Sequence, residues 1–120
     1  MLLKPARPCC CVGSKAKGLV VFAQIDHAAA AADVGLSLRP TELLVFGNAK
    51  GGTPLMQAVQ TIGVDLPLKA LVWQDASGVT WLSYNDPGWL AKRHGLAHEA
   101  DAAVRVLTAA LDALARAATT

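Results

Sequence analysis

The chain has 120 residues, the usual length of one domain, and slightly more than half of them are apolar. Four basic residues and no acid precede position 19, so the net charge of +2 comes from the N-terminal segment and the remainder is mildly acidic. This distribution argues against a nucleic-acid surface, which needs a basic stripe with aromatic residues among the charges. No apolar run approaches the roughly 18 residues of a membrane span, and no signal peptide is evident, so we expect a cytoplasmic protein without membrane contact.

The N-terminal segment, Met1–Lys17, is predicted to be an irregular, flexible tail, followed by a single domain over residues 18–120. It holds two prolines and shows neither alternation nor helical periodicity. Its three adjacent cysteines lack the spaced pairs of a structural zinc site, and neighbouring cysteines rarely bridge each other. A soft-metal or redox role for Cys9, Cys10 and Cys11 is the alternative to a plain tail. We expect no metal and no cofactor.

The first elements of the domain follow from composition and capping. Leu19–Ile25 is rich in β-branched and aromatic residues and predicts a strand. Asp26 is suited to cap an alanine-rich helix that runs through Val34 and ends at Gly35. Leu43–Phe46 is a short apolar run that predicts a second, buried strand.

A glycine-rich stretch follows the second strand. We expect a turn there, with Thr53 as the N-cap and Pro54 as the first residue of a helix reaching about Thr61. The N–H groups at such a helix start, with Asn48 and Lys50 nearby, favour an anion. The alternative is a purely structural turn, because the lysine precedes the glycines and the order does not match a phosphate-binding loop.

The second half of the chain predicts a hairpin and two helices. Side chains alternate between two faces in Leu68–Gln74 and in Val79–Ser83, and a turn joins these two predicted strands. Pro87 begins a helix that ends at Gly95. Glu99–Ala117 carries one apolar stripe and is the clearest helix. Short strands with intervening helices indicate the α+β class, here a small single domain with an antiparallel sheet and helices packed on one face.

Two polar groups are candidates for chemistry. Asp26 and His27 stand at a strand end and would suit acid–base work, with Asp26 orienting the histidine. Tyr84 and Asn85 follow the hairpin and would bind a ligand by hydrogen bonds. Each pair has a structural alternative, a helix cap for the first and a turn before the next helix for the second. Trp73 and the tryptophan at position 81 are expected in the core.

Four motifs then suggest a family: IDHA, RPTELLVFGNAKGGTPL, LPLKALVW and YNDP. Together they resemble the domain-of-unknown-function 302 family of prokaryotic proteins over Gly18–Leu96. The resemblance implies a β-α-β-β-β-β-α core similar to the TATA-binding-protein sheet, and no established activity. The family's first strand and helix have no visible counterpart in Met1–Lys17, as after a frameshift or a misplaced start, so we expect an atypical N-terminus and an unpaired sheet edge.

Three functions stay open at this point. The first is binding of a small anionic or polar ligand by Asn48, Lys50, Thr53, Tyr84 and Asn85. The second is an enzyme that uses Asp26 and His27, and the third is a protein-interaction module or homodimer without catalysis. Convergence of His27, Lys50 and Tyr84 on one pocket would favour the first two, and dispersal would favour the third.

Overall fold

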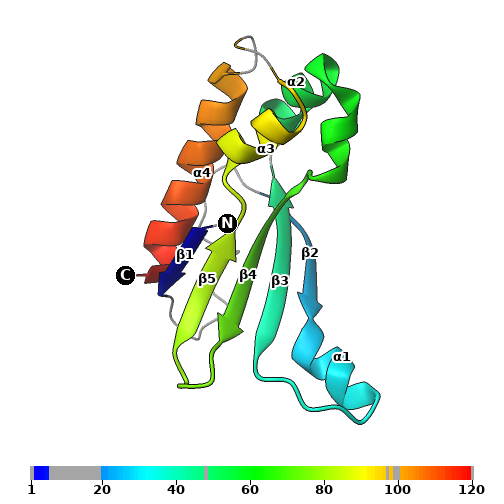
Figure 1. Cartoon of the computed structure of the whole chain (residues 1–120), viewed down its shortest axis with the longest axis vertical. Helices are drawn as coiled ribbons and strands as arrows, with labels where there is room; N and C mark the ends of the chain where they lie inside the picture. The colour runs from blue at the N-terminus through cyan, green and yellow to red at the C-terminus, as the bar shows by residue number, and fades with distance from the viewer. Residues whose placement is uncertain (1, 6–19, 48, 97, 99–100, 120) are drawn as a thin grey trace.

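The computed structural model describes residues 2–5, 20–47, 49–96, 98 and 101–119 (Figure 1). Five strands form one antiparallel sheet in the order β1-β5-β4-β3-β2. The strands are β1 Leu2–Pro5, β2 Val20–Asp26, β3 Thr41–Gly47, β4 Leu68–Gln74 and β5 Thr80–Tyr84. The helices are α1 His27–Asp33, α2 Ala49–Ala58, α3 Pro87–Arg93 and α4 Asp101–Thr119, with a 3-10 helix, η2, over Gln60–Val64. The α+β class with helices on one face of the sheet is confirmed.

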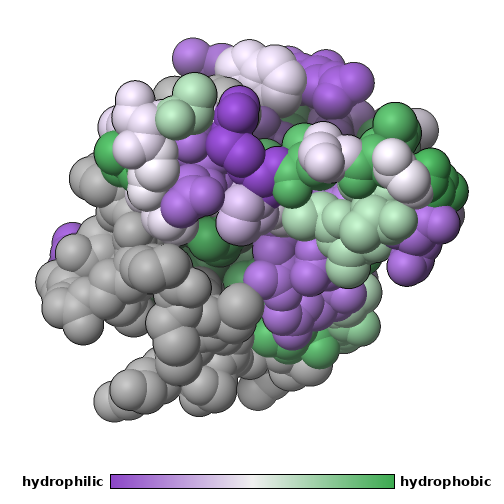
Figure 2. Space-filling model, turned by 90° about the horizontal axis from the view of Figure 1, so that it is seen from below, coloured by the Kyte–Doolittle hydropathy of each residue, from purple (hydrophilic) through white to green (hydrophobic). Residues whose placement is uncertain are grey.

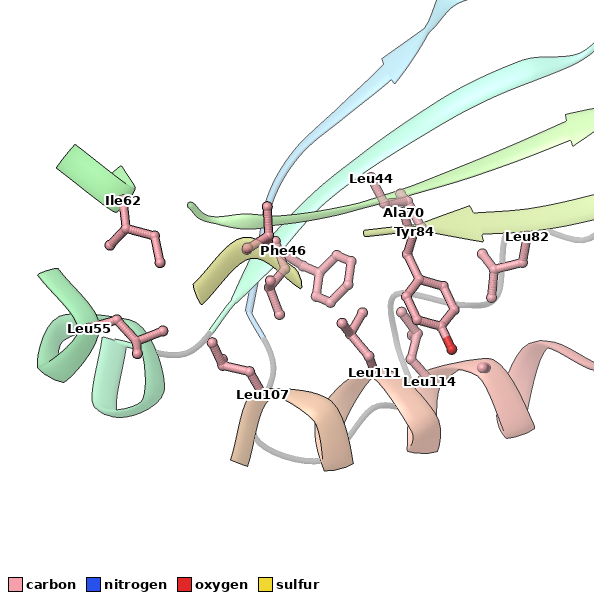
Figure 3. Close-up of a cluster of buried hydrophobic side chains, with 13 residues drawn as sticks. Leu44, Phe46, Leu55, Ile62, Ala70, Leu82, Tyr84, Leu107, Leu111 and Leu114 are labelled. Atoms are coloured by element: carbon pink, nitrogen blue, oxygen red, sulfur yellow. The ribbon is translucent and has the colours of Figure 1, made fainter. Parts of the chain in front are cut away.

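The core lies between one face of the sheet, here called the inner face, and the helices. Leu44 and Ala70 are cross-strand partners and therefore share a face of the sheet. Leu82 lies on the same face, because its partner Val72 is two residues from Ala70 in β4. From the other side, α4 presents the stripe predicted from its sequence, with Leu107 and Leu111 among its buried residues (Figure 3). Helices α2 and α3 and the 3-10 helix η2 each add a buried residue: Leu55, Leu90 and Ile62.

The predicted hairpin is present as β4 and β5, with the second strand starting one residue later than expected. The side chain of Asp75 organises the turn by accepting hydrogen bonds from the N–H groups of Ser77 (2.9 Å) and Val79 (3.0 Å). Gly78 takes a φ of 84°, which only glycine adopts at little cost. The helix ends predicted at Gly35 and Gly95 are confirmed by positive φ angles of 77° and 69°.

The start of α2 corrects the prediction made for the glycine-rich stretch. The helix begins at Ala49, so Thr53 is not its N-cap and Pro54 lies inside it. The reason is packing against α4: a Cβ added to Gly51 would lie 3.1 Å from Leu107 Cδ2. The glycine therefore permits close approach of two helices, a tertiary role that its local sequence did not reveal.

The N-terminal segment also departs from expectation. Leu2–Pro5 is not irregular: it forms β1, which pairs with β5 from Leu2↔Tyr84 to Pro5↔Trp81. Strand pairing uses backbone groups, so four residues without visible alternation can extend a sheet, and a proline is tolerated on an edge strand. The edge expected to be unpaired thus carries a strand. Residues 6–17, including the three cysteines, lie outside the described residues.

Candidate functional site

Among the residues predicted to form a site, those whose side chains the structure describes do not converge. Asp26 and His27 lie where β2 passes into α1, at the lower end of the sheet in Figure 1, whereas Thr53 lies in α2 at the upper end. Tyr84 is in the core, and Asn85 is exposed in the connection to α3. The backbone of Lys50 is in the first turn of α2, and Asn48 lies outside the described residues.

Asp26 acts as a helix cap. Its carboxylate Oδ1 accepts a hydrogen bond from the N–H of Ala29 at 2.9 Å, which satisfies one of the free donors at the start of α1. His27 is the first residue of that helix and is exposed. Both residues are described, and no hydrogen bond joins their side chains. The arrangement supports the capping alternative of the sequence analysis.

Tyr84 is a core residue with a polar end. Its side chain is 3% exposed and points from β5 toward α4, close to Leu114 (Figure 3). Among the described residues, its hydroxyl has no hydrogen-bond partner. The ring is thus enclosed in the core and does not face solvent, where it would meet a ligand.

A cavity of about 450 Å³ opens at the lower end of the sheet, between α1 and the ends of β3, β4 and β5. Leu44 and Val72 of the inner face line it together with polar residues from the strand ends. Asp26 and Glu42 are direct cross-strand partners and bring two carboxylates to it. Seen from this end, hydrophobic residues are visible in a recess next to hydrophilic ones (Figure 2). The full lining is Asp26, Ala28, Ala29, Pro40, Thr41, Glu42, Leu44, Val72, Trp73, Gln74 and Thr80.

A second, smaller cavity of about 270 Å³ lies at the upper end, beneath α2. Gly47, Gly52 and Thr53 from the glycine-rich motif line it with Leu66 and Pro67 from the motif that precedes β4. Its remaining lining residues are apolar: Phe22, Met56, Leu68 and Leu107. Two motifs far apart in the sequence therefore meet here, and the surface they form is hydrophobic.

The face of the sheet opposite the core carries apolar side chains, and none of the described helices lies over them. We call it the outer face, and Figure 1 shows its strands uncovered by any described helix. Trp73 and Trp81 stack on it with ring centroids 6.5 Å apart, and Trp73 Nε1 donates to Ser83 Oγ at 2.8 Å. Both tryptophans lie outside the core cluster, contrary to expectation. The apolar residues of the outer face are Ile25, Leu43, Val45, Leu71, Trp73 and Trp81.

Asp75 connects the outer face to the hairpin turn. Trp81 Nε1 donates to Asp75 Oδ2 at 2.8 Å, in addition to the two backbone bonds of the turn. The hydrogen bond from Trp81, followed by that from the N–H of Val79, holds the pKa of the Asp75 carboxyl below its usual value. The tryptophan ring is thereby fixed in orientation on the outer face.

Sequence reasoning missed an ionic cluster near the upper end of the sheet. His94 Nε2 lies 2.5 Å from Asp65 Oδ2, and Arg93 Nη1 lies 3.2 Å from both oxygens of the same carboxylate. Arg93 also sits 5.9 Å from the centre of the Trp89 ring. The cluster ties the end of η2 to the end of α3. Within the described part of the chain, no group of three or more His, Cys, Asp and Glu residues is placed to hold a metal ion.

Comparison with known proteins identifies the family. The model of the family described as "Domain of unknown function DUF302" matches residues 13–114. The chain belongs to this family. The match includes the whole stretch 18–96 that carried the resemblance and extends into α4. A crystal structure of an uncharacterized conserved DUF302 protein from Bacillus stearothermophilus has the same fold, with a TM-score of 0.82, 17% identity, and coverage of 96% of this chain and 94% of that one.

Curated relatives contain a similar stretch within a longer chain. The chain is 52% identical over 98 residues to "Fluoride-specific ion channel FluC 1" of Brucella suis biovar 1 (strain 1330), covering 80% of this chain and 39% of that protein. "Fluoride-specific ion channel FluC 2" of Brucella melitensis biotype 1 is equally similar, with 36% of its length covered. The DUF302 chain thus spans less than two fifths of the length of these relatives. None of its described helices is both long enough and apolar enough to traverse a bilayer.

Proposed function

We propose that this DUF302 chain is a protein-interaction module without catalysis, and that the outer face is its binding surface. The observation that carries the proposal is that the candidate site residues are dispersed over the fold. Asp26 and His27, Thr53 and Tyr84 occupy a helix start, a different helix and the core, so they do not form one polar site. The outer face instead gathers two stacked tryptophans and several aliphatic side chains, and aromatic residues of this kind anchor protein interfaces.

The curated relatives suggest where such a module works. In this proposal, the stretch that they share with the chain is an additional domain, and the channel activity in their names belongs to the rest of their sequence. Supporting this, α4 buries its apolar stripe against the inner face and leaves charged residues such as Arg105 exposed, as a helix in water does. Placement in the cytoplasm remains a prediction.

The test replaces Leu71 in the middle of the outer face by glutamate. Association of the chain with itself is measured by light scattering, and association with the full-length Brucella suis relative by co-purification. Leu71→Glu should weaken at least one of them about tenfold or more, whereas Val106→Glu, at an exposed position of α4, should weaken neither. If both associations survive Leu71→Glu in a folded variant, the outer face is not a binding surface.

Binding of a small ligand is a second candidate, favoured by the cavity beside α1. Its two carboxylates favour a ligand with a positive charge or hydrogen-bond donors, and Leu44 and Val72 favour an apolar body. This keeps the polar ligand of the sequence analysis but moves it to different residues. Binding of an anion near Lys50, at the start of α2, stays a prediction.

The cavity is tested with two small probes of opposite charge. Butylamine should raise the melting temperature by mass action, and butyrate should not. Glu42→Gln should reduce the effect of the amine, whereas Asp33→Asn, an exposed carboxylate at the far end of α1, should leave it intact. Equal responses to both probes would exclude a charge-selective site.

A further inference from the structure

Residues 27–38, here called the arm, extend from the lower end of the sheet (Figure 1). The arm consists of α1 and the first five residues of the connection to β3, 34–38. None of the residues of α1 is buried. After it, Val34 is 72% exposed, Leu36 66% and Leu38 50%. Three large apolar side chains are thus exposed within five residues, and a cluster of exposed apolar side chains of this kind often marks an interaction site.

The helix itself also requires support. An isolated helix shorter than about 12 residues is marginal in water even when it is rich in alanine. Helix α1 has seven residues, and its caps at Asp26 and Gly35 satisfy only its ends. Burial of an apolar side stabilises most protein helices, and here the described part of the same chain only half-buries Ala28 and Ala31. Contact with another molecule would bury more of the helix.

We infer that this other molecule is a second copy of the chain, and that the arm of each copy lies on the outer face of the other in a two-fold dimer. The inference rests on the proposed function and names the partner. A two-fold interface must be self-complementary, and this chain carries both an apolar projection and an apolar face over which no described helix lies. The shape of the molecule, with principal extents of 46 × 32 × 22 Å, leaves the arm at one end of its length.

The area that such an interface buries and the charged residues beside it both support pairing of the arm with the outer face. A stable interface buries about 800 Å² on each partner. The arm alone, with three large side chains, falls short of that, but a two-fold dimer buries both arm and outer face on every copy. Asp33 is exposed on the arm, and Lys69 is exposed on the outer face beside Val45. One charge of each sign, Asp33 on the arm and Lys69 on the outer face, therefore lies next to the apolar residues of the two surfaces, which favours their contact.

Two valines of almost equal exposure make a matched test. Val34 on the arm is 72% exposed, and Val64 in η2 at the other end of the molecule is 71% exposed. In light-scattering measurements over a dilution series, the unmodified chain should be a dimer that dissociates on dilution. Val34→Asp and Leu36→Asp should each weaken dimerisation about tenfold or more, and Val64→Asp should not.

A photo-crosslinking residue at position 36 identifies the contact. In a mixture of isotope-labelled and unlabelled chains, it should join peptides of different copies and reach the stretch 69–83 of the other copy. A chain that stays monomeric overturns the dimer, as does a dimer insensitive to both arm variants or a crosslink elsewhere. If the chain is monomeric but Leu71→Glu still abolishes association with the channel relative, the interaction module stands and only this inference fails.

Discussion

His94 Nε2 lies 2.5 Å from Asp65 Oδ2, although the two residues are 29 positions apart in the chain. Their side chains are only 11% and 14% exposed, whereas the nearby Arg93 is 54% exposed. The pair joins the connection before β4 to the end of α3, and so holds together two segments at the upper end of the sheet. A hydrogen-bonded pair shielded in this way depends on both partners, because either one left alone would be a poorly solvated polar group.

Removing either member of this pair should therefore destabilise the fold. We expect His94→Ala and Asp65→Ala each to lower the free energy of unfolding by roughly 1–3 kcal/mol. Arg93→Ala is the matched control: its exposed interaction with the same carboxylate should contribute less than about 1 kcal/mol. Urea unfolding measures all three. Equal losses for Arg93→Ala and His94→Ala would contradict the special role of the histidine.

The two adjacent glycines of α2 should respond differently to substitution. At Gly52 an added Cβ would have its nearest neighbour at 3.7 Å, so Gly52→Ala should stabilise the helix by roughly 0.5–1 kcal/mol. At Gly51 the neighbour is Leu107 Cδ2 at 3.1 Å, and Leu107 is held in the core. Gly51→Ala should therefore not stabilise the fold as Gly52→Ala does. Gly51→Leu should lower the free energy of unfolding by about 1–3 kcal/mol, because the larger side chain overpacks the core. Identical melting temperatures for the two alanine variants would refute close helix packing at Gly51.

The turn carboxylate should make stability depend on acid pH. The folded-state pKa of Asp75 is lowered from its ordinary value of 3.8, chiefly by the hydrogen bond from Trp81. The contribution of Asp75 to the stability of the fold is therefore complete above the pKa of Asp75 in the unfolded chain. It is lost as the pH falls through the pKa of Asp75 in the folded protein. Asp75→Asn should reduce stability at neutral pH, and its difference from the unmodified protein should shrink below about pH 4.

Ser77→Ala is the control for this titration. It keeps the backbone N–H that donates to Asp75 and removes only the serine hydroxyl. Its unfolding free energy should follow that of the unmodified chain across the acid range. If the Asp75→Asn difference is the same at pH 3 and pH 7, the hydrogen bonds do not favour the charged form of Asp75.

Tyr84 offers a test of a buried hydroxyl. Among the described residues its oxygen has no partner, and a buried polar group without a partner costs free energy. Tyr84→Phe should therefore leave stability unchanged or raise it by about 1 kcal/mol, while Tyr84→Ala should lose about 3–5 kcal/mol because it opens a cavity. A clear loss of stability in the phenylalanine variant would show that the hydroxyl is satisfied.

Local patterns determined most of the fold in advance. The hairpin was predictable because alternating residues flank turn residues, and α4 because its apolar stripe has the helical period. The cap at Asp26 and the helix ends at Gly35 and Gly95 were predictable because they depend on backbone geometry within a few residues. The motifs also indicated the family, which the match over residues 13–114 shows.

Only the tertiary structure decided the rest. It placed Gly51 against Leu107, moved the start of α2 to Ala49, and paired Leu2–Pro5 with β5. These outcomes depend on contacts between segments distant in sequence, and local propensity carries no information about such contacts. The same reason separates the candidate site residues: Asp26 and Tyr84 belong to different strands, and the sheet register and the helix layer decide that Tyr84 enters the core, away from Asp26.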